Sequence, residues 1–275
     1  MTKRIILYFS ATGNSLYAAQ QLAGEEGKAV SIPRAMKRKE WTYEAEEIGF
    51  VFPSLANMPP NLVREFLAKA SLKADYFFTI ITCGWAKGAA PEIWQQLAQS
   101  AGIDIHYIQP LLMVNNWIQH ADIEEELTID KQVGTQLATI QTDLQARRHF
   151  IPTTTDEERA EWADMLERGG LTAESGMLMK SEKRFAANDE CIRCGICTRV
   201  CPRGNWHLGG LQAENYGQCD YCLACINNCP RKAIQFVASP LSLLPPERNP
   251  ARRYRNPDIQ LYELEIANAQ YDRYR

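Results

Sequence analysis

The 275-residue sequence lacks the signatures of membrane, nucleic-acid-binding and nicotinamide-dependent proteins. No apolar run approaches the roughly 18 residues that a membrane-spanning helix needs. The short apolar run near the start is soon broken by polar residues, so we expect no secretory signal there. Lysine and arginine number 30 against 33 acidic residues, without the basic stripe that would indicate nucleic acid. No G-x-G-x-x-G follows an expected strand, which leaves a Rossmann-type nicotinamide site unsupported.

Histidine is scarce as well. The four histidines are His106, His120, His149 and His207, and none has the spacing of an acid–base or metal-binding pair. We therefore predict structural roles for them and name no catalytic residue.

Cysteine, by contrast, is frequent and regularly spaced. Eight of the nine cysteines form two copies of C-x2-C-x2-C-x3-C-P, which end at Pro202 and Pro230. This spacing is typical of bacterial ferredoxins that hold [4Fe–4S] clusters. Three thiolates two residues apart can wrap around one face of a cubane, but a fourth from the same short run cannot reach the remaining iron. The last ligand must therefore come from elsewhere in the chain.

The resemblance to two-cluster ferredoxins implies how the cysteines are shared. In those proteins the last cysteine of each run binds the other cluster. Carried onto this sequence, the resemblance implies Cys191, Cys194, Cys197 and Cys229 for one cluster, and Cys219, Cys222, Cys225 and Cys201 for the second. A disulfide framework and structural zinc are the alternatives. Disulfide frameworks are expected in small secreted domains and zinc usually takes paired C-x2-C knuckles, so we favour clusters in a reducing cytoplasm.

The N-terminal part begins with a strand that leads into a hydroxyl-rich turn. Ile5–Phe9 is a continuous apolar run, typical of a central parallel strand, and the turn Ser10–Ser15 and a helical stretch to Ala23 follow. The free N–H groups and positive end of such a helix favour a phosphate at the turn. The hydroxyls add donors without adding charge, which suits the phosphomonoester of flavin mononucleotide (FMN). An ordinary helix-capping loop is the alternative.

Beyond this turn, strand and helix patterns alternate. Strands are expected near 28–32 and at 48–52, 76–82 and 103–108, and helices at 61–70, 91–100 and within 131–148. Such alternation predicts a doubly wound α/β fold with a parallel sheet in the flavodoxin order 2-1-3-4-5. In that fold the ligand lies beyond the carboxyl ends of the strands.

The sequence S-x-T-G-N-S after the first strand resembles the phosphate loop of flavodoxins. The whole chain resembles flavodoxin-like proteins fused to a C-terminal two-cluster ferredoxin, the EFR1-type family. This resemblance implies FMN held by three loops, at 10–15, 53–59 and 82–88. The residues expected to contact FMN are Ser10, Thr12, Gly13, Asn14, Ser15, Pro53, Ser54, Leu55, Ala56, Asn57, Thr82, Cys83, Gly84, Trp85 and Gly88.

Two of these residues carry an alternative. The loop at 53–59 contains no aromatic residue, so Trp85 is the aromatic neighbour expected for the flavin ring, unless it packs at the domain surface. Cys83 is expected to be a small buried thiol at a strand end.

The two halves together predict an electron-transfer protein. We expect a flavodoxin-like FMN-binding domain at 1–150, a connecting segment at 151–184, a small α+β two-cluster ferredoxin-like domain at 185–238, and a C-terminal extension with a terminal helix at 239–275. FMN holds one or two electrons and each cluster passes one. FMN and the clusters together can therefore convert a two-electron transfer into single-electron steps. The redox partner is a protein or a small molecule. Three roles of the N-terminal domain are compatible with the sequence: a catalytic oxidoreductase site, a relay between partner proteins, and a docking module.

Overall fold

The computed structural model describes residues 2–118, 121–169, 179–180, 185–236 and 252–268. Several sequence expectations fall elsewhere and lie outside the described residues. They are the role of His120, the parts of the connecting segment at 170–178 and 181–184, the last residues of the ferredoxin-like domain, and the stretches 239–251 and 269–275 of the C-terminal extension.

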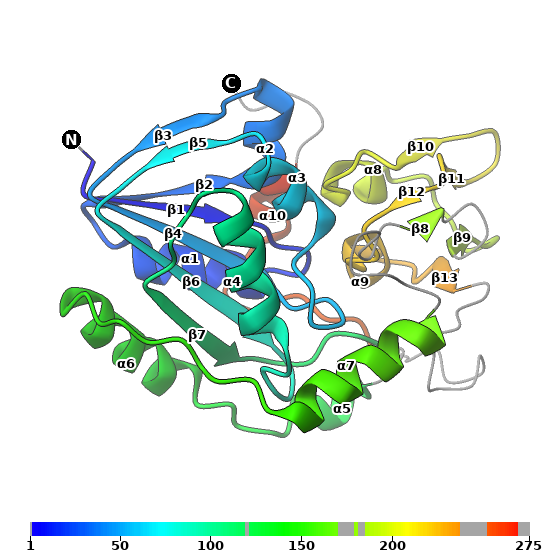
Figure 1. The fold of residues 1–275 in the computed structure, drawn as a ribbon. Coiled ribbons are helices and arrows are strands. Elements are labelled where there is room, and N and C mark those ends of the chain that lie inside the picture. The colour runs from blue at the N-terminus through cyan, green and yellow to red at the C-terminus, as the bar shows by residue number, and fades with distance from the viewer. Residues whose placement is uncertain (1, 119–120, 170–178, 181–184, 237–251, 269–275) are drawn as a thin grey trace.

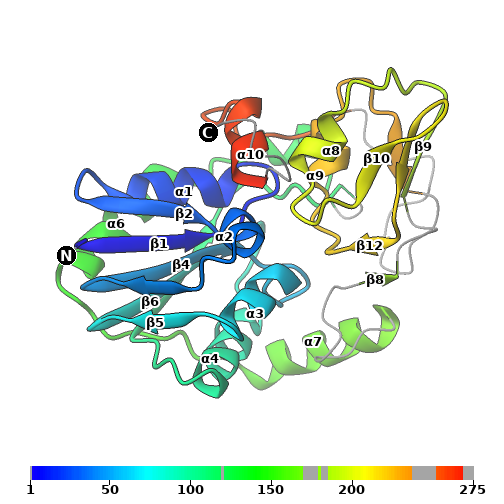
Figure 2. The same ribbon diagram turned by 90° about the horizontal axis from the view of Figure 1, so that it is seen from above.

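A five-stranded parallel sheet forms the larger lobe (Figures 1 and 2). Its strands, in spatial order, are β2 (Gly27–Ser31), β1 (Arg4–Tyr8), β4 (Glu47–Pro53), β6 (Tyr76–Cys83) and β7 (Tyr107–Leu112). Numbered along the chain, this is the order 2-1-3-4-5, so the α/β flavodoxin-like prediction is confirmed. The central strands β1, β4 and β6 are buried over nearly their whole length, as expected for strands covered on both faces.

Helices cover both faces of the sheet. One core gathers α1 (Asn14–Ala23), α6 (Val133–Gln145) and α10 (Leu261–Asn268) against the sheet, and the other gathers α2 (Ile32–Arg38), α3 (Asn61–Leu67) and α4 (Ala90–Ser100). In the second core the Trp94 ring packs edge-on against Phe50 and Phe52, with centroids 5.0 and 4.7 Å away. The Trp94 indole N–H donates to Thr79 Oγ1 at 2.7 Å, so this buried ring leaves no polar atom unpaired.

The fifth strand begins four residues later than the sequence suggested. Ile103 and Ile105 are buried and alternate as in a strand, but the pairing of β7 with β6 starts at Tyr107, opposite Phe78. The two isoleucines belong to the core next to α4, so their alternation reflects packing and not pairing. Pro110 lies within β7, where an edge strand tolerates a missing N–H.

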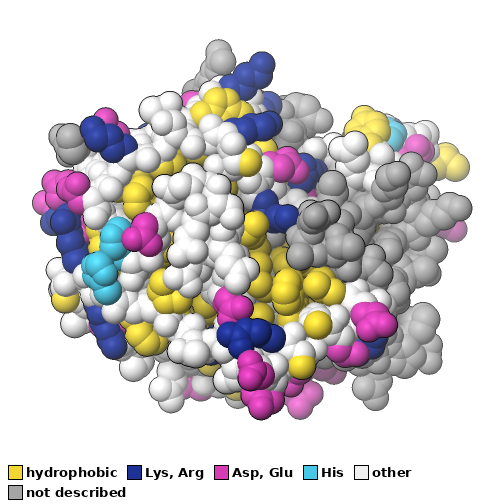
Figure 3. Space-filling view, in the orientation of Figure 1, with side chains coloured by type: hydrophobic (Ala, Val, Ile, Leu, Met, Phe, Trp, Pro, Cys, Tyr) yellow, Lys and Arg dark blue, Asp and Glu magenta, His cyan; other side chains and the backbone are white. Residues whose placement is uncertain are grey.

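Four further elements were not expected within 1–150, and the helix α2 (Ile32–Arg38) is one of them. A parallel ribbon joins β3 (Thr42–Glu44) to β5 (Ser71–Lys73), and the short helix α5 (Ile123–Glu126) follows β7. Within the expected connecting segment lies α7 (Asp156–Gly169). Figure 3 shows apolar side chains gathered between α4 and α7, where a cavity is lined by Met58, Ile93, Leu97 and Trp162.

The smaller lobe is built from short antiparallel pairs and two single-turn helices. The pairs are β9 (Phe185–Ala187) with β13 (Ile234–Phe236), β10 (Trp206–Leu208) with β11 (Ala213–Asn215), and β8 (Met179–Lys180) with β12 (Gln218–Cys219). The helices are α8 (Ile196–Val200) and α9 (Ala224–Asn228), which pack against each other. In Figures 1 and 2 this lobe lies beyond the carboxyl ends of the parallel strands. It therefore borders the edge of the sheet where ligands of this fold bind.

Candidate metal centres and cofactor pocket

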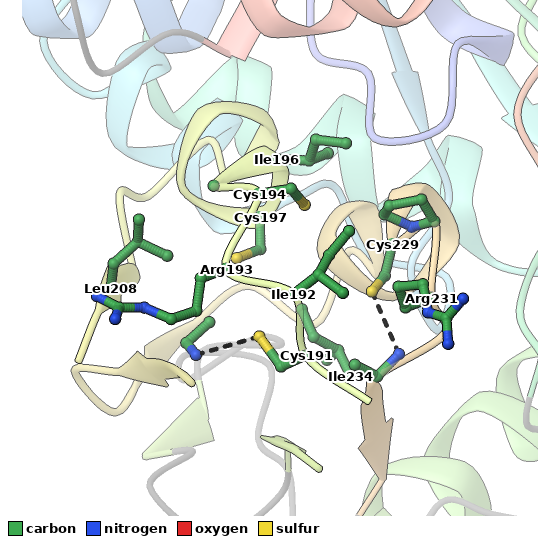
Figure 4. Close-up of a pocket in the computed structure, with 14 residues that line it drawn as sticks. Cys191, Ile192, Arg193, Cys194, Ile196, Cys197, Leu208, Cys229, Arg231 and Ile234 are labelled. Atoms are coloured by element: carbon green, nitrogen blue, oxygen red, sulfur yellow. Dashed lines mark hydrogen bonds between the residues drawn. The ribbon is translucent and has the colours of Figure 1, made fainter. Parts of the chain in front are cut away.

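One hollow in the smaller lobe is lined by four cysteines from both motif copies. Cys191, Cys194 and Cys197 come from the loop and first turn of α8, and Cys229 follows α9. Figure 4 shows their sulfur atoms around a common space. Backbone N–H groups of Ala213 and Ala233 donate to the sulfurs of Cys191 and Cys229, at 3.4 and 3.2 Å. We call these four cysteines the first thiol set.

A second hollow is lined by Cys201, Cys219, Cys222 and Cys225, the second thiol set. Phe185, Trp206 and Leu223 form apolar parts of its wall. Here the N–H of Asn205 donates to Cys201 Sγ and the N–H of Tyr221 donates to Cys219 Sγ, both at 3.2 Å. Each hollow therefore has four thiols and backbone donors directed at sulfur, which are the ligand type and the hydrogen bonds that tune an iron–sulfur cluster.

The environment of these thiols is unfavourable for negative charge in the polypeptide alone. Burial, together with smaller effects of the neighbouring thiols Cys194 and Cys229, raises the pKa of Cys197 to about 12. Burial likewise raises the pKa of Cys219 to about 12, against the opposing hydrogen bond from Tyr221. A bound metal centre supplies the positive charge that deprotonates such thiols. The donor sets thus fit cationic clusters.

The spacing within each set also fits a cluster. Within the described residues, no three His, Cys, Asp or Glu side chains are arranged to hold a single metal ion. The four thiols of each set instead line a hollow, which leaves room for a cluster.

A third cavity lies at the carboxyl ends of the parallel strands, between the two lobes. It encloses about 500 Å³ of empty space, part of which is open to solvent. Ten of the fifteen residues expected around FMN line it: Ser10, Thr12, Asn14, Ser15, Pro53, Ser54, Leu55, Thr82, Cys83 and Gly84. The structure thus brings together the three loops that the sequence singled out.

The turn before α1 has the geometry of an anion cradle. Gly13 adopts φ +104°, which an L side chain rarely adopts, and its N–H donates to Ser10 Oγ at 3.1 Å. Thr12, Asn14 and Ser15 are buried, and within the described residues no acceptor is found for their backbone N–H groups. Unpaired N–H groups at the start of a ten-residue helix favour a phosphate. This cradle fits the phosphate of FMN.

Five of the expected FMN neighbours do not line the cavity: Gly13, Ala56, Asn57, Trp85 and Gly88. Ala56 and Asn57 form the tip of a turn closed by two hydrogen bonds between Leu55 and Met58. Trp85 is 57% exposed, and its indole N–H donates to Glu126 Oε1 at 2.9 Å. The aromatic ring of the lining belongs instead to Trp117.

The loop after β7 completes the cavity, and the sequence analysis missed it. Val114, Asn115, Asn116 and Trp117 line the cavity, and Asn116 Nδ2 donates to Thr12 Oγ1 at 2.7 Å. The available signal was the rule that all parallel strands end at the same edge, because this loop follows the last strand. Because the fifth strand was expected four residues too early, this loop was not expected at the carboxyl end of the strand.

The C-terminal segment around Asn256 packs against the turn before α1, which we call the phosphate turn after its expected ligand. The N–H of Asn256 donates to Thr12 O at 2.8 Å, and the Asn256 side chain donates to Asn14 Oδ1 at 3.1 Å. A Cβ on Gly13 would lie 2.9 Å from the Cβ of Asn256, so glycine is needed here for this contact as well as for its φ. No local sequence pattern indicates this neighbour.

Cys83 and Cys222 are the two cysteines in the lining of this cavity. Burial raises the pKa of the Cys83 thiol to about 12, with Lys131 opposing the shift, so at neutral pH this thiol is protonated. Cys222 belongs to the second thiol set and also lines that hollow. A single side chain therefore borders both the expected flavin cavity and the second hollow.

Three of the four histidines, His106, His149 and His207, lie within the described residues, and each has a partner. Phe77 N–H donates to His106 Nδ1 at 3.0 Å, and His106 also packs against Tyr76 and His149. His207 stacks on Tyr216 with ring centroids 4.4 Å apart. These three side chains lie outside the three cavities that contain the cysteines.

Comparison with known proteins supports the assignment of iron–sulfur clusters to the C-terminal part of the chain. A family model of 4Fe–4S dicluster domains matches residues 136–245. The pyruvate synthase subunit PorD of Methanocaldococcus jannaschii is 36% identical over 52 residues, which are 18% of this chain. The chain spans about 60% of the length of that relative.

Two solved structures resemble the N-terminal half only weakly. The crystal structure of a putative flavoprotein from Bacteroides uniformis has a TM-score of 0.32 and 16% identity, and the match covers 46% of this chain and 96% of that protein. The Trp repressor binding protein of Bacillus subtilis has a TM-score of 0.30 and 8% identity, and covers 50% and 97%. TM-scores this low support no inference about this chain.

In the described residues, no helix has the length and apolar character needed to cross a membrane.

Taken together, the match to the family model and the two thiol sets identify the C-terminal part of this chain as similar to 4Fe–4S dicluster domains.

Proposed function

We propose that this chain is an electron-transfer protein that binds FMN and two [4Fe–4S] clusters, organised as in the fused EFR1-type family. FMN would occupy the cavity of a flavodoxin-like domain at 1–150, joined by 151–184 to a ferredoxin-like domain at 185–238 and to the C-terminal extension 239–275. When bound, FMN supplies transfer of one or two electrons and each cluster supplies transfer of one. The parallel strand order, the phosphate turn and the dicluster match support the three parts of this proposal.

The ligand roles follow from the linings. The first thiol set (Cys191, Cys194, Cys197, Cys229) would hold one cluster and the second (Cys201, Cys219, Cys222, Cys225) the other. The N–H groups of Thr12, Asn14 and Ser15 would hold the phosphate, with hydroxyl donors from Thr12 and Ser15. Leu55 and Trp117 offer apolar surface to the ring.

The observation that carries the proposal is the position of Cys222. Cys222 lines both the FMN cavity and the second hollow, so the two cavities share a wall at this residue. Tyr221, next to Cys222, packs its ring against Trp117 of the FMN cavity with centroids 5.8 Å apart. FMN and the second cluster would thus be neighbours within one chain, which is what exchange of electrons between them requires.

Cofactor analysis tests the proposal directly. Protein purified without oxygen should contain roughly eight iron and eight labile sulfide per chain, and about one FMN, by analogy with the flavodoxin site. Zinc in place of iron, or colourless protein, would contradict the cluster assignment. A protein that carries iron and sulfide but takes up no added FMN would contradict the flavin assignment and leave the N-terminal domain a docking module.

A kinetic comparison separates an oxidoreductase from a relay. If the flavin site has catalytic activity, the anaerobically reduced protein should reduce quinones, oxygen or peroxide faster than free FMN does. Rates no faster than free FMN with every small acceptor would remove the enzyme role and leave transfer between partner proteins.

A further inference from the structure

The two thiol sets differ in their access to solvent. Cys194, in the first set, is exposed, whereas the other eight cysteines are buried or partly buried. In the second set, Cys201 and Cys225 are buried, and Cys222 faces the FMN cavity. The second set therefore borders the interior cofactor cavity, and the first set borders the outside.

The rim of the first hollow is apolar and carries positive charge. Ile192 and Leu208 line the hollow and are 60% and 43% exposed (Figure 4). Exposed side chains of this size beside a cofactor site are a feature of interaction surfaces. The lining also contains Arg193 and Arg231 and no carboxylate. Arg231 is paired with the exposed Glu190 at 2.8 Å, a surface ion pair that holds it only weakly.

We infer that electrons leave the chain at this rim, around Cys194, to an acidic one-electron carrier protein. The inference rests on the proposed function and adds the order of the two thiol sets and the kind of partner. In the forward direction, a reduced flavin in the cavity would give up one electron, and the groups held by the second set and then by the first set would pass it to the carrier. The flavin would be oxidised by one electron and the carrier reduced by one.

Contacts between the two thiol sets support this order. Cys197 of the first set and Cys225 of the second belong to one buried core. The helices α8 and α9, which carry these two residues, pack against each other. The second set thus stands between the FMN cavity and the first set, and the apolar rim surrounds the far end of the path.

A matched pair of leucines tests the rim. Leu208 lines the first hollow, whereas Leu211, on the same hairpin and 91% exposed, does not. Rubredoxin serves as an acidic one-electron acceptor and cytochrome c as a basic one. Leu208→Glu should weaken binding of oxidised rubredoxin, measured by calorimetry, by about fivefold to tenfold, because it replaces a central apolar contact with like charge. Leu211→Glu should change it less than about twofold.

Charge is tested separately. Arg193→Gln should slow reduction of rubredoxin at low salt and flatten the dependence of that rate on salt, because the steering charge is removed. Wild-type protein should reduce rubredoxin more slowly as salt rises, and cytochrome c should show no such decrease. A decrease with cytochrome c instead, or equal effects of Leu208→Glu and Leu211→Glu, would overturn the inference. Reduction of ferricyanide but of neither protein would assign the rim to a small acceptor and overturn it as well.

The order of the two sets has its own test. In Cys194→Ser, rapid reduction of the flavin should still be followed by bleaching of the iron–sulfur absorbance, while rubredoxin reduction is lost. In Cys219→Ser, which alters the second set without touching the FMN cavity, that bleaching should be lost. The reverse pattern would overturn the order. Iron content is measured for each variant, and wild-type protein without clusters or without FMN would instead contradict the proposed function.

Discussion

The hydroxyl of Tyr254 donates a 2.8 Å hydrogen bond to the side-chain oxygen of Asn14, a residue 240 positions away in the sequence. Asn14 begins α1 at the phosphate turn. The backbone N–H of Tyr254 donates to Asn227 Oδ1 at 3.0 Å, and Asn227 lies in α9 between two cysteines of the thiol sets. The C-terminal segment therefore connects the phosphate turn to the cluster lobe through buried polar contacts.

Tyr254→Phe should weaken FMN binding. The change removes one of two donors to the buried Asn14 oxygen, at a cost of about 1–3 kcal/mol, and loosens the turn that would hold the phosphate. We expect a Kd for FMN about tenfold higher, from flavin fluorescence quenching in anaerobic titrations. Tyr262→Phe, at a 56% exposed position on α10, is the control and should leave the Kd unchanged. Equal affinities in the two variants would show that the C-terminal contact does not support the phosphate turn.

Glu126 joins two loops of the cavity at the carboxyl ends of the strands. Its Oε1 accepts from the Trp85 indole, and its Oε2 accepts from the Asn115 N–H at 3.0 Å and from Lys131 at 3.1 Å. Burial acts to raise the pKa of this carboxyl, but the hydrogen bonds from Asn115, Trp85 and Lys131 outweigh it, and the net pKa is lowered. A carboxyl whose pKa is lowered in the folded state makes its full contribution to stability when the pH is above the ordinary glutamate pKa of about 4.5. This contribution is lost as the pH falls below that value.

Glu126→Gln should therefore cost stability at neutral pH and progressively less in acid. The amide cannot accept from all three donors, so we expect a loss of about 1–3 kcal/mol at neutral pH. The difference in unfolding temperature between this variant and wild type, measured by circular dichroism, should become smaller when the pH is below the ordinary glutamate pKa of about 4.5. Glu124→Gln, at an exposed position of the same helix, should show no such gap. A gap that is constant with pH would mean that the Glu126 charge contributes nothing.

Much of the fold follows from local pattern. The apolar runs of β1, β4 and β6 and the helices between them specify a parallel sheet, and a parallel sheet brings its strand ends to one edge. For this reason Ser10, Pro53 and Thr82, each at or just after the end of a strand, line one cavity although they lie far apart in sequence. Likewise, a fixed cysteine spacing limits which thiols can meet, because one short run cannot surround a cubane.

What the sequence analysis missed depends on contacts between distant segments. Trp117, and not Trp85, lines the cavity because β7 ends at Leu112. The start of that strand was misplaced because buried residues that pack next to α4 alternate as they would in a strand. The hydrogen bond of Tyr254 to Asn14 and the double role of Cys222 arise from how the two lobes meet. No periodicity or spacing along the chain encodes that arrangement.

Arg203 is the centre of a charged contact between the lobes. Its guanidinium pairs with the buried Asp220 at 2.8 Å and with Glu65 of α3 at 2.6 Å. The other oxygen of Asp220 accepts a hydrogen bond from the N–H of Leu62 at 3.4 Å. A carboxylate of the smaller lobe therefore also pairs with a donor in the first turn of α3. Removing one member of a buried pair leaves an uncompensated charge, which is far more costly than the loss of an exposed pair.

Arg203→Met should accordingly destabilise the protein by about 3–5 kcal/mol, because Asp220 would remain buried without a cation. The double variant Arg203→Met/Asp220→Leu should recover most of that loss, since apolar replacement of both partners removes the buried charge. Lys3→Met breaks the exposed pair with Glu26 and should leave the stability nearly unchanged. Urea midpoints from circular dichroism, with iron content checked in each variant, measure all three. An Arg203→Met variant no less stable than Lys3→Met would show that solvent screens this network and that apolar packing holds the lobes together.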